Sequence, residues 1–204
     1  MKSKYGITVR GIVFSALFAS LLVVLSFLQV NIGFTPVPIT LGNMGVMLAG
    51  AFLGPYYGFF SVIIVVILTA LGLPLLDGAG GLAVILGPSG GYIWMWPFDA
   101  LLVGLFVSRI KGNHITAFVK IFLTIEIFGS LLCYVTGVTW LAHSVHVSLS
   151  KALVLGFYPY ILGDALKALL TTLIIMPVRR IYPSWKLVGT GGTKVAKLSE
   201  NDSV

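Results

Sequence analysis

Six apolar segments, separated by short breaks rich in Gly and Pro, limit what this chain can fold into more than any other feature. They cover residues 8–30, 39–53, 59–76, 92–107, 117–141 and 157–176. A helix that crosses a bilayer needs about 20 predominantly apolar residues, and all but the second segment come close to or exceed that length. We therefore predict an all-α fold, in which six transmembrane helices within residues 1–180 form a polytopic bundle.

The composition agrees with a chain that is solvated by lipid. Charged residues make up 9% of the 204 residues, hydrophobic residues make up 58%, and the mean hydropathy is +1.05. A soluble domain carries about 25% charged residues, and no soluble core could hide this much apolar surface. The single cysteine, Cys133, excludes a disulfide framework. We predict an integral membrane protein whose net charge of +7 reflects topology and not a nucleic-acid partner.

The distribution of Lys and Arg predicts how the helices are oriented. With six spans and an N-terminus inside, all but two of the 13 basic residues lie at cytoplasmic ends; the exceptions are Lys151 and Lys167. This bias favours a multi-pass protein with both termini in the cytoplasm. Residues 181–204 are polar and glycine-bearing, and we expect a mobile cytoplasmic tail. The glycines at 189–192 lack the spacing of a phosphate-binding loop, so no ATP site is predicted.

Two opposite charges interrupt the last apolar segment. Asp164 and Lys167 are three residues apart, so they share one face of a helix. A charge in a bilayer costs about 2.5–3.5 kcal/mol on insertion scales, so intramembrane ionisable groups usually serve a function. If the helix starts near residue 157, Asp164 lies about 10 Å from its outer end. We expect a binding pocket that opens to the outside; the alternative is an ion pair that only joins helices.

The remaining polar residues of the apolar segments are less informative. Asp99 and Glu126 could relay protons, pair with Lys167 or face water, and we favour a packing role. His143 and His146 fall in the predicted loop before the sixth helix. A zinc site needs further ligands and none lies nearby in the sequence, so no metal site is predicted.

Small residues recur at helical spacing in the first segment. Ser15 and Ala19 form one i,i+4 pair, and Ala16 and Ser20 form another. Such pairs allow close approach of helices in lipid. They serve either packing within the bundle or docking of another membrane protein, and the spacing does not distinguish these roles.

Three motifs stand in order along the chain: PVPITL (36–41) with GVMLAG (45–50), GGLAVILGPSGGY (80–92) and GDALK (163–167). Together they resemble the BioY family, the biotin-specific S components of energy-coupling factor (ECF) transporters. Residues 36–41 followed by 45–50 resemble the signature of its second helix. Residues 80–92 resemble its hallmark loop, and residues 163–167 resemble the G-D-x-x-K motif of its last helix. The resemblance extends over nearly the whole predicted membrane domain.

The resemblance implies a six-helix S component in a prokaryotic plasma membrane that captures biotin from outside. It is not an enzyme, and no cofactor is expected. Transport would need a transmembrane coupling subunit and two ATPase subunits, which fits the lack of a phosphate loop. The family's A-x-x-x-A patch for the coupling subunit corresponds to Ala16 and Ser20, with Ser15 and Ala19 beside them.

The polar groups of biotin are complementary to Asp164 and Lys167. The ureido ring carries two N–H donors and one carbonyl acceptor, so Asp164 is assigned to the N–H groups and Lys167 orients Asp164 or contacts the ligand. The thioether ring and alkyl tail require apolar walls. The candidate walls are aromatic residues near the outer ends of the helices: Tyr92, Tyr134, Trp140 and Tyr160. Gly90 and Gly91 would allow backbone N–H groups to approach the ligand closely.

Some positions depart from the pattern of the family. Gly42, Ala79 and Ile93 stand where some relatives carry Gln, Asn and Arg, and Ser20 replaces the second Ala of the docking patch. These differences concern ligand contacts more than the class of protein.

Three alternatives stay open from the sequence. One is an S component for another vitamin. Another is a rhomboid-like serine protease, because residues 87–90 (GPSG) match G-x-S-G, although a base on a neighbouring helix is not evident. A purely structural membrane protein would leave Asp164 and Lys167 unexplained.

Overall fold

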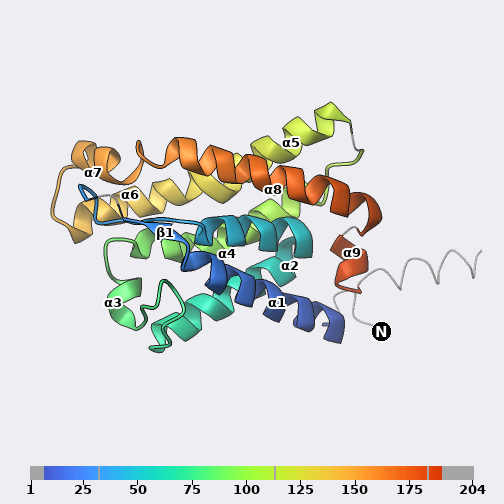
Figure 1. Cartoon of the computed structure of the whole chain (residues 1–204), viewed down its shortest axis with the longest axis horizontal. Coiled ribbons are helices and arrows are strands. Elements are labelled where there is room, and N and C mark those ends of the chain that lie inside the picture. The colour runs from blue at the N-terminus through green and yellow to red at the C-terminus, as the bar shows by residue number, and fades with distance from the viewer. Residues whose placement is uncertain (1–6, 32, 113, 183, 190–204) are drawn as a thin grey trace, which may run out of the picture.

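The computed structural model describes residues 7–31, 33–112, 114–182 and 184–189, and they form a mostly helical bundle (Figure 1). Five helical runs in this part of the chain are long and apolar enough to cross a membrane. The prediction of a helical, polytopic membrane protein is therefore confirmed. The helices are α1 (Val9–Ser26), α2 (Gly42–Ala70), α3 (Leu82–Ile85), α4 (Gly90–Val107), α5 (Ile115–Glu126), the π-helical η1 (Ile127–Leu131), α6 (Leu132–Ser144), α7 (Leu149–Gly156), α8 (Ile161–Ile181) and α9 (Ser184–Leu187).

Helix α2 combines the second and third apolar segments, and it is broken at Gly54. Gly54 has φ 78° and ψ −174°, a conformation essentially restricted to glycine, and Pro55 follows it. The two arms double back on each other: a Cβ on Gly58 would lie only 2.9 Å from the Cα of Gly50. The break therefore makes a tight helical hairpin with an arm of residues 42–53 and an arm of residues 55–70 (Figure 1).

Helix α1 packs against both arms of this hairpin. A Cβ on Gly45 of the first arm would meet the Cα of Leu22 at 2.9 Å, so only a glycine allows this approach. On the second arm, Ser15 Oγ donates to the carbonyl oxygen of Tyr57. Ser15 is buried and Ala19 packs on the core, so this pair serves packing within the bundle. Ala16 and Ser20 form the opposite, exposed face of α1.

The structure moves several predicted helix boundaries, and three of these shifts bear on the site. Helix α1 ends at Ser26, because β1 (Gln29–Val30) pairs antiparallel with β2 (Ile39–Thr40). The second helix consequently starts at Gly42 and not at residue 39. The last helix, α8, starts at Ile161 instead of residue 157. Asp164 therefore lies in the first turn of α8, and the predicted depth of about 10 Å was too large by the length of four residues.

The fifth predicted segment is one helical run that changes its winding midway. Helix α5 continues into η1 and then into α6 without a loop. A π-helical turn inserts an extra residue and widens the helix, which shifts the face that the following residues present. In this chain η1 lies beside α4 and α8, and Ser130 of η1 and Tyr134 of α6 both reach α8.

The two ends of the bundle differ. At one end the β hairpin, α3 and α7 lie together, and at the other end α9 lies against the start of α1 (Figure 1). There the N–H of Thr8 donates to the Tyr57 hydroxyl at 2.8 Å, and Thr8 Oγ1 donates to the carbonyl oxygen of Val188. The first and last described residues thus meet. Of the predicted tail, 181–204, residues 190–204 lie outside the described residues, and its mobility stays a prediction.

Candidate functional site

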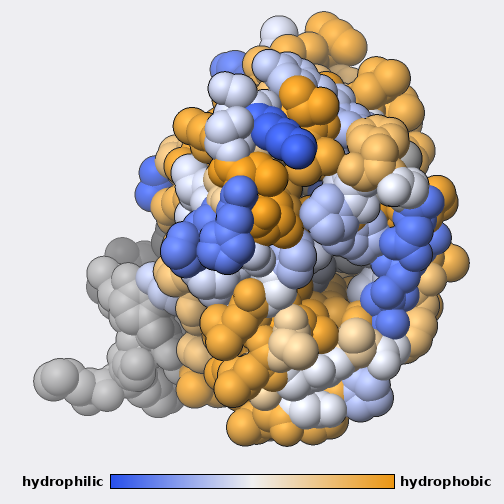
Figure 2. Space-filling model, turned by 90° about the vertical axis from the view of Figure 1, so that its left-hand side faces the viewer, coloured by the Kyte–Doolittle hydropathy of each residue, from blue (hydrophilic) through white to orange (hydrophobic). Residues whose placement is uncertain are grey.

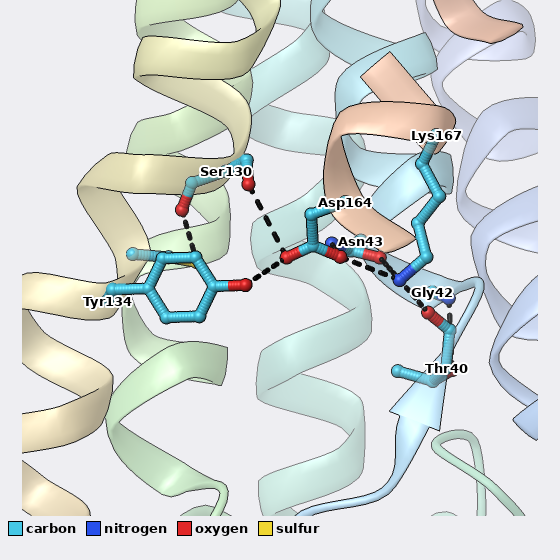
Figure 3. Close-up of polar contacts among 8 residues, drawn as sticks. Thr40, Gly42, Asn43, Ser130, Tyr134, Asp164 and Lys167 are labelled. Atoms are coloured by element: carbon cyan, nitrogen blue, oxygen red, sulfur yellow. Dashed lines mark hydrogen bonds and ion pairs between the residues drawn. The ribbon is translucent and has the colours of Figure 1, made fainter. Parts of the chain in front are cut away.

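A buried ion pair forms the centre of the candidate site. Lys167 Nζ lies 2.8 Å from Asp164 Oδ1, and the two residues are only 6% and 4% exposed. The i,i+3 spacing places both on the inner face of α8, as the sequence predicts. Neither side chain turns toward the lipid, because the first arm of α2 and the η1–α6 run cover them (Figure 3).

The ammonium of Lys167 has no donor left for a ligand. It donates to Asp164 Oδ1, to Asn43 Oδ1 at 3.0 Å and to the carbonyl oxygen of Thr40 at 2.7 Å. A lysine has three donors, so all are used. The acceptor on Thr40 is available because β2 ends there and α2 begins at Gly42. Lys167 thereby ties α8 to the strand that leads into the helical hairpin.

The carboxylate of Asp164 is also fully bonded. Oδ1 accepts from Lys167 and from Asn43 Nδ2 at 3.0 Å, and Oδ2 accepts from the Tyr134 hydroxyl at 2.5 Å and Ser130 Oγ at 3.4 Å (Figure 3). A carboxylate has about four acceptor positions. A ligand N–H must therefore displace a protein donor, and Ser130, at the longest of these distances, is the easiest to displace.

Two cavities adjoin this cluster. The inner cavity, of about 80 Å³, is bordered by Asp164, Lys167, Asn43 and Tyr134. The outer cavity, of about 300 Å³, extends toward the loop before α4 and contains Gln29, Asp77 and Ala79. The two share Pro38, Thr40, Ser89 and Trp96 in their linings, so they lie next to each other, and together they are called the cleft. Its larger part reaches the lower limit of small-molecule sites, about 300 Å³.

The cleft lies toward the end of the bundle that carries the β hairpin, α3 and α7. Figure 2 looks onto this end and shows hydrophilic side chains gathered among apolar ones around a hollow. The predicted combination of a polar pair and a glycine-bearing loop at one end is thus present in the structure.

Three of the predicted aromatic walls line the inner cavity. They are Tyr92, Tyr134 and Tyr160. The Tyr92 hydroxyl donates to the carbonyl oxygen of Gly156 at 2.8 Å, and the Tyr160 hydroxyl donates to the carbonyl oxygen of Val37. Burial raises the pKa of the Tyr160 hydroxyl above its ordinary value, which keeps it protonated as a donor. These bonds fix the rings as cavity walls.

The other predicted contacts lie outside both cavity linings. Trp140 Nε1 donates to the carbonyl oxygen of Gly87 at 2.9 Å, and its ring packs on Trp94. A Cβ on Gly91 would meet Trp140 Cβ at 2.4 Å, and one on Gly90 would meet the carbonyl oxygen of Ile85 at 2.1 Å. These glycines therefore permit close packing of α4 on α6 and on α3, and their predicted role in binding gains no support from this placement.

The two remaining acids of the membrane segments do not pair with Lys167. Asp99 is fully buried, and neither of its carboxyl oxygens has a hydrogen-bond partner among the described residues. Glu126 Oε2 is likewise buried without one in the described part of the chain. His143 belongs to the last turn of α6 and not to a loop, and its ring lies 5.6 Å from that of Trp140.

Sequence reasoning missed four residues of the site: Asn43, Thr40, Ser130 and Trp96. The available signal for Asn43 was an amide in an otherwise apolar segment, which is as unusual in lipid as a charge. Thr40 contributes a backbone oxygen, and Trp96 is one of many aromatic residues. Ser130 faces Asp164 from within η1, and no pattern in the sequence predicts a π-helical turn.

The chain matches the BioY family over residues 1–184. It belongs to the BioY family. The biotin transporter BioY of Lactococcus lactis subsp. cremoris is 37% identical and covers 84% of this chain and 92% of its own length. The biotin transporter BioY of Rhizobium etli is 39% identical, with coverage of 85% and 95%.

A solved structure has the same fold. The crystal structure of the S-component for biotin from an ECF-type ABC transporter is 38% identical to this chain. Its TM-score is 0.76, and the match covers 84% of this chain and 92% of that one. The relatives carry the names of transporters, so the protease interpretation of Ser89 is not supported. The family predicted from three motifs is confirmed.

Proposed function

We propose that this chain captures biotin as the substrate-binding S component of an ECF-type transporter. The observation that carries the proposal is the buried Asp164–Lys167–Asn43 cluster at the base of a cleft in a BioY fold. A purely structural ion pair would not need an adjoining cavity. Transport itself is assigned to a transmembrane coupling subunit and two ATPase subunits, which supply the energy that this chain does not.

In the proposed topology the bundle crosses the cell membrane six times, with both termini in the cytoplasm. The two arms of α2, on either side of Gly54, count as separate passes, and the run Ile115–Ser144 counts as one. The contact between Thr8 and Val188 supports an even number of passes, because it brings the start and the end of the described chain to one side. The cleft then opens to the outside.

In the proposed complex the ureido ring enters the inner cavity. One ring N–H takes the position of Ser130 Oγ on Asp164 Oδ2, next to the Tyr134 hydroxyl, which remains a donor. Asn43 Nδ2 uses only one of its two donors on Asp164, so the second is available for the ureido carbonyl. Lys167 holds Asp164 and Asn43 in place and does not itself contact the ligand.

The ring needs more room than the inner cavity of about 80 Å³ offers. We propose that the ring spreads into the shared part of the cleft beside Trp96, with Tyr92 and Tyr160 as walls. The wider outer cavity then receives the valerate tail. This arrangement uses the two cavities for the two chemically different ends of one ligand.

The proposed surface for the coupling subunit is the exposed side of α1. Ala16 and Ser20 lie on it, and Ser20 Oγ is bonded to the carbonyl oxygen of Ala16 at 3.0 Å, so the hydroxyl requires no outside partner. Small side chains at this spacing allow another helix to approach closely.

The test is equilibrium binding of labelled biotin to the purified chain in detergent, with riboflavin and thiamine as competitors. Saturable binding that only biotin displaces supports the proposal. Displacement by another vitamin would favour an S component of different specificity. Lys151→Gln, an exposed change on α7 outside both cavities, serves as the control that retains binding.

A further inference from the structure

The outer cavity carries polar groups that recognition of the ureido ring does not use. Among its lining residues are Gln29, Asn31 and Asp77, and it is larger than the inner cavity that holds the ion pair. Since Trp96 and Thr40 line both cavities, the outer cavity is the adjoining space for the other end of a ligand that is anchored at Asp164.

Two of the polar groups that line the outer cavity are hydrogen-bond acceptors. The side-chain oxygen of Gln29 is buried and has no hydrogen-bond partner among the described residues, which is costly unless a ligand supplies a donor. Asp77 is exposed at the edge of the cavity. Its backbone has a φ of 58°, and its N–H donates to Ser26 Oγ at 3.3 Å. Its carboxylate adds a negative charge.

A cation for a carboxylate ligand is lacking. Of the described residues that line the outer cavity, none is Lys, Arg or His. Lys167 borders the inner cavity, but all three of its donors are bonded to Thr40, Asn43 and Asp164. A carboxylate in the outer cavity would meet the unpaired oxygen of Gln29 and the like charge of Asp77, and the side-chain donors that line this cavity, such as the Asn31 amide, are uncharged.

We propose that the outer cavity accepts biotin derivatives whose carboxyl group is converted to an amide, and that it prefers them when they end in an ammonium group. The amide N–H would donate to the side-chain oxygen of Gln29, and the ammonium would lie near Asp77. The inference rests on the proposed function, because the ureido ring must occupy the inner cavity for the tail to reach these residues.

The test compares three ligands on the purified full chain in detergent: biotin, biotinamide and the aminoethyl amide of biotin. Both amides should bind at least as tightly as biotin, and the aminoethyl amide about twofold to fivefold more tightly than biotinamide, as for an exposed ion pair. Weaker binding of either amide than of biotin overturns this inference and leaves the proposed function intact. Failure of all three to bind removes the proposed function itself.

Two variants locate the effect. Gln29→Met removes the acceptor at similar length and should lower the affinity of biotinamide relative to biotin by about twofold to tenfold. Asp77→Asn removes the charge, and Asn tolerates the left-handed backbone, so the advantage of the aminoethyl amide over biotinamide should disappear. Lys151→Gln should leave the ratios unchanged. If Gln29→Met weakens all three ligands equally, Gln29 only supports the strand and the inference is wrong.

Discussion

At the scale of residues, the ion pair of α8 is saturated by its own neighbours. Asp164 accepts from four side chains, and Lys167 donates to three oxygens. Such a network holds each member in one orientation, but it leaves a ligand to compete with protein donors. The long contact from Ser130 is the one that costs least to break. In the proposed function, recognition therefore proceeds by exchange of a hydrogen bond.

Removal of both charges should separate binding from stability. We expect Asp164→Asn or Lys167→Met alone to destabilise the protein by about 3–5 kcal/mol, since each leaves a buried charge unpaired. The double variant should recover much of this loss but still fail to bind biotin. Melting temperature and equilibrium binding in detergent measure the two effects. Biotin binding by the double variant would remove Asp164 from the site.

Tyr134 and Ser130 should behave differently although both donate to Asp164 Oδ2. We expect Tyr134→Phe to lower the free energy of unfolding by about 1.5–3 kcal/mol, because a hydrogen bond to a charged group that is present with and without ligand is lost. Ser130→Ala should change the affinity by less than about 1 kcal/mol, since the ligand replaces this hydroxyl. Thermal unfolding checks the first effect and titration calorimetry checks the second, and a loss of affinity above about 1 kcal/mol for Ser130→Ala would contradict the proposed exchange.

At the scale of elements, the helical hairpin of α2 and the turn η1 bring the site together. The break at Gly54 returns the chain along α1. Asn43 lies at the start of the first arm, where its side chain reaches Asp164 of α8. A Cβ on Gly104 would lie 2.4 Å from the carbonyl carbon of Gly54, which shows how closely α4 packs on the turn. On the other side, η1 directs Ser130 and Tyr134 at the same carboxylate.

Gly54→Ala should destabilise the bundle through its backbone and not through a clash. The nearest atom to a Cβ at this position is Ser184 at 3.8 Å, an ordinary contact, but φ is 78°. A side chain in that conformation costs about 1–3 kcal/mol. Gly163→Ala is the matched control, because its Cβ would meet nothing within 4 Å and α8 is helical there. Thermal unfolding in detergent should show a loss for the first variant and none for the second.

At the scale of the whole molecule, α1 presents two faces with different partners. Ser15 and Ala19 pack against the bundle, whereas Ala16 and Ser20 lie on the exposed side. In the proposed function the same i,i+4 spacing in one helix serves two purposes, packing and docking, and only the position of α2 distinguishes them. A docking face that is separate from the cleft would allow the coupling subunit to bind without blocking the ligand.

A bulky change on the exposed face should affect transport but not binding. We expect Ala16→Leu combined with Ser20→Leu to abolish ATP-dependent biotin uptake and copurification with the coupling subunit, because helices cannot approach closely over leucines. Biotin affinity of the isolated chain should stay within about twofold, since neither residue lines a cavity. Val24→Leu, exposed on the same helix, is the control. Normal uptake by the double variant would place the docking face elsewhere.

The sequence by itself determined the membrane class, the pairing of Asp164 with Lys167 and the family. These features follow from local information: the length of apolar runs, a spacing of three residues on a helix and short motifs. Charge is so costly in lipid that the pair had to lie inside the bundle, and the structure confirms this. Tyr92, Tyr134 and Tyr160 border the same inner cavity as the pair, and their role in ligand binding stays a prediction.

Only the tertiary structure decided which groups form hydrogen bonds with Asp164 and Lys167. Asn43 is 121 residues from Asp164 in sequence, and the Thr40 carbonyl oxygen that accepts from Lys167 is a backbone atom without a signature. Trp140, Gly90 and Gly91, which were expected at the ligand, lie where helices pack together, and no contact in the structure tests their role in binding. A helix pattern specifies which residues share a face, whereas the neighbour of that face depends on how the helices pack around one another.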